Sequence, residues 1–183
     1  MNSTGADLLV LGLGNVLLGD DGVGPAAVAR LHDHHVIPDG VLCLDGGTLG
    51  LSLLPYLEDA RMVVMVDAIA ADAPAGTLVR LEGSAVGPAV ATRLSPHQVG
   101  VADLLEGARW HDREPTRLVL LGIVPERIEL GLGLSKSVLR TMPALVDLIC
   151  AEAASLGHPF EVREDAAADT NFDVTRLFGG AVS

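Results

Sequence analysis

Short apolar runs alternate along the chain with longer segments in which apolar residues recur at helical spacing. The runs predict β-strands, which cover Asp7–Gly12, Val41–Asp45, Arg61–Asp67, Thr77–Glu82 and Arg117–Val124. Between them the spacing predicts helices over about Val23–His34, Leu49–Glu58, Gln98–Ala108 and Lys136–Ser155. Alternation of strands and helices is typical of a sheet covered by helices on both faces. We therefore expect a single-domain, three-layer α/β/α fold with a twisted, mostly parallel five-stranded sheet.

The character of each run predicts its place in that sheet. Four of the runs are nearly all apolar, as expected for central strands that are buried on both faces. The run TLVRLE, Thr77–Glu82, alternates apolar with polar residues, so we expect it at an edge with one face in water.

Length and composition agree with one domain and a tail. The chain has 183 residues, of which 49% are hydrophobic and only 3% aromatic, so the core must consist of aliphatic side chains. We assign residues 1–155 to the α/β domain. The segment 156–183 shows no sustained period and mixes charges with Ala and Gly, which predicts a loosely held C-terminal tail.

Charge and cysteine usage limit the partners and the compartment. The formal net charge is −12, which repels a polyphosphate backbone, so we expect no nucleic-acid partner. No apolar run approaches the roughly 20 residues needed to cross a bilayer, so we expect no membrane association. The two cysteines, Cys43 and Cys150, have no CxxC spacing and are typical of buried thiols in a reducing cytoplasm.

The first strand runs into a loop, LLVLGLGNVLLGDDGVG, that resembles a dinucleotide-binding fingerprint but lacks its third glycine, since that position is Leu17. Asp20 and Asp21 follow at the expected start of the first helix, where they would repel a phosphate. The loop therefore supplies ligands and does not receive an anion. A helix N-cap explains one carboxylate, Asp20, and leaves Asp21 as the stronger functional candidate.

Two further polar residues are expected at the edge of the sheet where ligands bind, beyond the carboxyl ends of parallel strands. Asp67 ends an apolar run, where a carboxylate is costly unless it is paired or bound to a cation, although a turn cap is the alternative. His97 follows Pro96 in a loop before a helix, where an imidazole can act as a ligand or as an acid or base.

With Asp21, Asp67 and His97 in place, the chain resembles the hydrogenase maturation proteases, endopeptidases that trim the large subunit of [NiFe] hydrogenases. The matching stretches, in the order of the family, are GLGNVLLGDDGVG, LDGGTLG, VDA, LSPHQVGVADLL and LLGIVPE. They cover the chain from about Leu8 to the helix ending near Ser155. Some family members carry Glu at the position of Asp21.

The resemblance implies that Asp21, Asp67 and His97 are the catalytic residues and contact nickel. It also implies that the enzyme removes a short C-terminal extension from the large-subunit precursor after nickel has been inserted. The family is described both as aspartic-type and as metal-dependent. Two carboxylates and an imidazole suit nickel, zinc and other divalent ions, and three protein ligands leave open positions for a metal that a substrate already holds.

Two other functions remain open at this point. A peptidyl-tRNA hydrolase-like enzyme also begins with a strand and a GLGN-like loop, but the net charge of −12 argues against an RNA substrate. A nucleotide-binding Rossmann-like module is compatible with Asp45 at the end of the second run, and it requires a phosphate where Asp20 and Asp21 lie. The absence of HExxH and GxSxG argues against a zinc-peptidase or serine-hydrolase centre.

Overall fold

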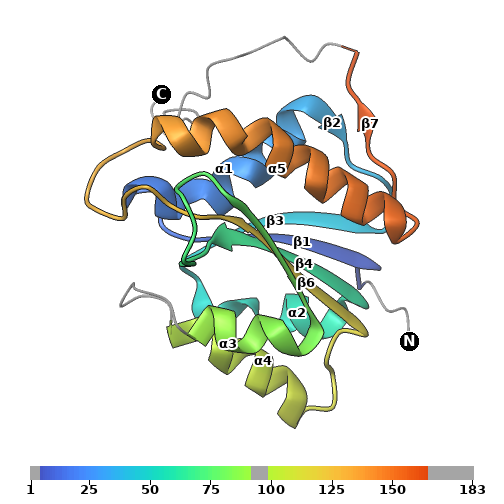
Figure 1. The fold of residues 1–183 in the computed structure, drawn as a ribbon. Helices are drawn as coiled ribbons and strands as arrows, with labels where there is room; N and C mark the ends of the chain where they lie inside the picture. Colours follow the sequence, from blue (N-terminus) through green and yellow to red (C-terminus); the bar gives the residue numbers. More distant parts are fainter. Residues whose placement is uncertain (1–4, 92–98, 165–183) are drawn as a thin grey trace, which may run out of the picture.

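The computed structural model describes residues 5–91 and 99–164, which form a five-stranded sheet between two layers of helices (Figure 1). The strand order is β3-β1-β4-β6-β5. Strands β3 (Val41–Gly47), β1 (Leu8–Leu13), β4 (Met62–Ala68) and β6 (Arg117–Ile123) are parallel, and β5 (Leu78–Glu82) is antiparallel to β6. The predicted three-layer fold is confirmed.

The positions of the two edge strands test the sequence patterns separately. β5 lies at one edge, as its alternation predicts. β3 lies at the other edge, so the expectation that Val41–Asp45 is a central strand is wrong. Only Cys43 and Gly46 of β3 are buried, whereas all residues of β1 and β4 are. A continuous apolar run indicates that helices cover both faces of a strand at least in part. It does not reveal whether the strand pairs with a neighbour on both sides, as a central strand does, or on one side only.

Helices cover both faces of the sheet (Figure 1). α1 (Val23–His34) and α5 (Lys136–Ser155) lie on one face, and α2 (Leu54–Asp59), α3 (Val86–Ala91) and α4 (Val99–Trp110) lie on the other. The bounds of α1 and α5 match the prediction. The predicted helix Leu49–Glu58 is instead a 3-10 turn, η2 (Gly50–Leu53), followed by α2, and α3 was not predicted. Gln98, the predicted start of α4, lies outside the described residues.

The side chains of β1 show how the two layers are held. Leu8 and Val10 pack with α1 and α5, and Leu9 and Leu11 pack with α2, α3 and α4. All four are completely buried. Alternate residues of a strand point to opposite faces, so an apolar residue at every position is required when helices cover both sides.

The start of the predicted tail contacts the domain. β7 (Glu161–Val162) pairs antiparallel with β2 (His35–Val36), and the ring of His158 contacts Asp7 Oδ2 at 2.7 Å. The Arg61 guanidinium and His158 beside Asp7 hold the pKa of that carboxyl below its usual value. Residues 165–183 lie outside the described residues, and the assignment of 156–183 as a tail stays a prediction.

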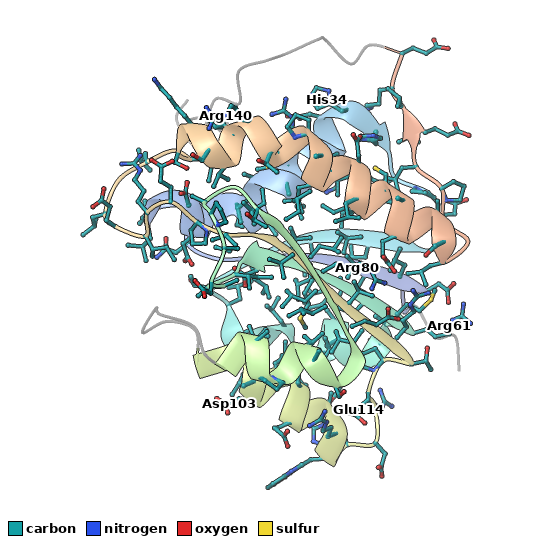
Figure 2. All side chains as sticks on the ribbon, in the orientation of Figure 1. His34, Arg61, Arg80, Asp103, Glu114 and Arg140 are labelled. Carbon is teal, nitrogen blue, oxygen red and sulfur yellow. The ribbon has the colours of Figure 1, made fainter. Side chains whose placement is uncertain are left out.

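A charged cluster fastens α5 to the antiparallel edge of the sheet. Glu152 is 6% exposed, and its carboxylate accepts from Arg80 of β5 at 2.9 and 3.0 Å and from Arg117 of β6 at 3.0 Å. Glu82 also accepts from both arginines. Figure 2 shows Arg80 between the sheet and α5. A buried carboxylate held by two guanidinium groups satisfies its hydrogen bonds within the protein.

Replacing Glu152 with Ala is expected to lower the free energy of unfolding by about 2–3 kcal/mol, because two guanidinium groups lose a nearly buried acceptor. Both arginines keep Glu82, which limits the loss. Urea denaturation measures the effect. The control is Glu106→Ala, which removes an exposed ion pair with Arg109 and is expected to lower the free energy of unfolding by less than about 1 kcal/mol. Equal stability of the two variants would contradict the inferred role of the cluster.

Candidate functional site

Asp21 lies in the 3-10 turn η1 (Gly19–Gly22), between the end of β1 and the start of α1. The backbone N–H of Asn15 donates to its Oδ2 at 2.8 Å. At Gly14, φ is +125°, and a Cβ there would lie 1.8 Å from the carbonyl oxygen of Asp21. Glycine is therefore required at this position, because it lets the loop pass directly over Asp21. The GLGN stretch thus shapes the loop that holds a carboxylate.

Asp67 is the penultimate residue of β4 and is completely buried. The backbone N–H of Ala68 donates to its Oδ1 at 2.7 Å. A carboxylate in such a place costs free energy unless polar groups surround it, so the position is not one that folding alone would favour. The structure places this carboxylate at the carboxyl end of β4, where it is completely buried and not half-buried as expected.

Asp21 and Asp67 lie at the same edge of the sheet. η1 contacts β4, and the start of α1 approaches β4 so closely that a Cβ on Gly24 would lie 2.4 Å from the carbonyl oxygen of Val66. The carboxyl ends of β1, β3, β4 and β6 meet at this edge, on the left of Figure 1. The third predicted residue, His97, lies outside the described residues. Convergence of all three side chains therefore stays a prediction.

The burial of Asp21 corrects one expectation. We expected Asp21 to lie on an exposed loop, as functional residues commonly do, but Asp21 is only 2% exposed. The tight turn of η1 and the glycine-rich path before it cover the side chain. In residues 5–91 and 99–164 no group of three or more His, Cys, Asp and Glu side chains is arranged to hold a metal ion. A site that uses Asp21 and Asp67 thus needs a further ligand from beyond these ranges or from a substrate.

Asp20 has a role that the sequence did not reveal. It is completely buried, and it caps neither η1 nor α1. Instead, its Oδ2 accepts from the backbone N–H groups of Glu126 at 2.8 Å and Arg127 at 3.1 Å, and its Oδ1 accepts from Ser135 at 2.6 Å. Those residues begin and end the connection between β6 and α5. Asp20 therefore clamps that connection onto the loop after β1.

Replacing Asp20 with Ala is expected to lower the free energy of unfolding by about 3–5 kcal/mol, since three backbone N–H groups, of which that of Ser135 is buried, lose a completely buried acceptor. Asp20→Asn is expected to cost about 1–3 kcal/mol, because one amide oxygen still accepts while the NH2 group faces another donor. Thermal and urea denaturation measure both, with Asp33→Ala on the exposed end of α1 as the control. A stability of Asp20→Ala equal to that of Asp33→Ala would refute the clamp.

The chain is an α/β protein with two buried carboxylates at the carboxyl edge of a mostly parallel sheet. Known proteins are similar to it in sequence and in fold. A family model described as hydrogenase maturation protease matches residues 25–152, a range that contains Asp67 and His97 and begins four residues after Asp21. The hydrogenase 2 maturation protease of Escherichia coli K12 is 37% identical over 147 residues, 79% of this chain and 89% of that protein. The chain therefore belongs to the hydrogenase maturation protease family and is a peptidase.

Other relatives and solved structures agree. The hydrogenase expression/formation protein HupD of Rhodobacter capsulatus is 41% identical over 67% of this chain, which spans 59% of that relative. The hydrogenase maturating endopeptidase HybD from E. coli superimposes with a TM-score of 0.82 at 33% identity, over 86% of this chain and 98% of that one. The [NiFe] hydrogenase maturation protease HybD from Thermococcus kodakarensis gives 0.64 at 29% identity, over 80% and 97%.

Neither of the other two functions gains support. The buried carboxylates Asp20 and Asp21 lie where a dinucleotide would need its pyrophosphate to bind. The glycines of the loop serve close packing of the protein against itself, since a Cβ on Gly12 would lie 2.5 Å from the carbonyl oxygen of Gly24.

Proposed function

We propose that this peptidase removes a short C-terminal peptide from the nickel-loaded large-subunit precursor of a [NiFe] hydrogenase and thereby completes its maturation. The observation that carries the proposal is the placement of two buried carboxylates, Asp21 and Asp67, at one edge of the sheet in a chain of this family. Relatives named as hydrogenase maturation proteases support the choice of substrate.

The chemistry of the donor set fits nickel carried by the substrate. Asp21 and Asp67 each have one oxygen fixed by a backbone N–H, which orients the carboxylate in the way that outer hydrogen bonds orient metal ligands. His97 supplies an imidazole, the third ligand of the proposal. Three protein ligands leave positions open for groups of the substrate, so the metal can be recognised while the precursor still holds it. Zinc or another divalent ion is expected to occupy the same ligands in its place.

The same residues provide the groups that hydrolysis of a peptide bond needs. A carboxylate can accept a proton from the attacking water, and an imidazole or a protonated carboxyl can return one to the leaving amine. This assignment makes Asp21, Asp67 and His97 the catalytic residues in either an aspartic-type or a nickel-dependent mechanism. We place the reaction in the cytoplasm, because Cys43 and Cys150 are both free thiols. Among the described residues, no helix is long and apolar enough to cross a membrane.

The experiment that tests the proposal is incubation of the purified protein with a nickel-loaded large-subunit precursor. Mass spectrometry is expected to show a shortened large subunit and one released C-terminal peptide. A nickel-loaded precursor that remains intact would refute the proposed function. Loss of a peptide from the N-terminus would refute it equally.

A further inference from the structure

Three exposed leucines lie in two loops whose backbones pair just before Asp21, at the carboxyl edge of the sheet. Leu17 is 49% exposed, Leu130 is 88% exposed and Leu132 is 59% exposed. Their backbones lie side by side, because the N–H of Gly131 donates to Leu17 O at 3.0 Å and the N–H of Gly19 donates to Gly131 O at 2.9 Å. We refer to Leu17, Leu130 and Leu132 as the leucine rim. Apolar side chains gathered in water commonly mark a binding surface.

The rim is held in place, although it belongs to loops. The connection between β6 and α5, at the far left of Figure 1, carries Leu130 and Leu132. Asp20 accepts hydrogen bonds from both ends of this connection, at Glu126 and at Ser135. Hydrogen bonds thus hold both ends of the loop that exposes Leu130 and Leu132.

Resting on the proposed function, we propose that the leucine rim is the docking surface for an extended, apolar segment of the precursor polypeptide that leads into the catalytic site. Continuity with the site supports this occupant, since Leu17 and Asp21 belong to one loop and the N–H of Asp21 donates to Leu18 O at 3.3 Å. Removal of apolar surface from water on both partners drives such docking.

Backbone and charge further define the segment. Within the described ranges, the N–H and C=O groups of Leu130 and Leu132 form no hydrogen bond with the protein, so the main chain of a peptide can bind them. The connection also carries Glu126, Arg127 and Glu129, with Arg127 paired to Glu129, and so adds one net negative charge on a chain of net charge −12. An acidic segment is disfavoured by this field, and the docked segment is expected to lack Asp and Glu.

The test compares Leu130→Ser/Leu132→Ser with Trp110→Ser. Trp110 is 86% exposed at the end of α4, away from the rim, and serves as the matched control. Each change is made in the full chain with Asp67→Asn, so that the nickel-loaded precursor stays uncut, and the Kd for this precursor is measured by biolayer interferometry. The same changes with Asp67 intact give kcat and KM. Sedimentation measures the oligomeric state.

We expect the leucine changes to raise Kd and KM by about tenfold or more with kcat within about twofold, and the control to change both by less than about twofold. An unchanged Kd for the leucine variant would overturn the docking surface and leave the proposed function intact. Tight, rim-dependent binding without cleavage by the wild-type protein would support docking and refute the proposed function. A dimer that only the leucine variant breaks, with unchanged Kd, would assign the rim to a second copy and overturn the proposal.

Discussion

Asp21→Asn and His97→Ala are each expected to lower the rate of precursor processing by at least about a hundredfold, the range that loss of an acid–base or ligand group produces. The first change keeps the shape of the Asp21 side chain but removes its charge, and the second removes the imidazole entirely. The measurement is the initial rate of peptide release from the nickel-loaded precursor. Asp72→Asn, at an exposed position, is the control and should retain the wild-type rate.

The fold of these variants must be checked separately, because Asp21 is buried. In Asp21→Asn the new amide oxygen can still accept the Asn15 N–H, so we expect a stability loss of only about 1 kcal/mol. Asp67→Asn is expected to abolish processing as well and to cost some stability, because Asp67 is also buried. Circular dichroism and thermal denaturation distinguish inactivation from unfolding. Normal processing by a folded Asp21→Asn or His97→Ala variant would eliminate that residue from the catalytic site.

Precursor that lacks nickel is expected to remain uncut by the same enzyme, with a difference in rate of at least about a hundredfold. Asp21, Asp67 and His97 form an incomplete ligand shell, and a shell with open positions binds free metal weakly. The enzyme should therefore purify largely free of metal. Without the ion that joins the site to the precursor, the scissile peptide is not oriented against the attacking group.

The assay compares apo and nickel-loaded precursor, each with one enzyme preparation and no added metal. Elemental analysis of the enzyme is the accompanying control, because metal carried over by the enzyme would obscure the comparison. Cleavage of both precursors at the same rate would show that the three residues act as an ordinary acid–base site. Such a result would favour the aspartic-type mechanism over the nickel-dependent one.

Local sequence patterns predicted most of the elements because their physical causes are local. The helical spacing of apolar residues gave α1 and α5 with their observed bounds, and alternation in TLVRLE placed β5 at an edge. The same patterns misplaced β3, since apolar side chains report which faces are covered and not which strands pair. They also missed α3, whose short sequence VGPAVA contains Gly and Pro, both poor helix formers.

The sequence also predicted only part of the candidate site. A carboxylate that interrupts an apolar run can be recognised from the sequence alone. Asp67 was predicted in this way, because an unpaired carboxylate is costly at the end of a buried strand. Two adjacent aspartates are also visible, but their separate roles are not. Asp20 accepts from Glu126, 106 residues later in the chain, and no local rule can predict a partner at that separation.

The sequence by itself therefore determined the α/β class, the bounds of the long helices and the acidic character of the loop after β1, because these follow from side-chain type and spacing. Only the tertiary structure decided that Asp21 is buried, that Asp20 clamps a distant connection, and that Leu17 meets the stretch around Leu130 at the surface. Each of those features depends on backbone segments far apart in the chain. Their approach is fixed by packing of the whole sheet and its helices, and no pattern of neighbouring residues encodes it.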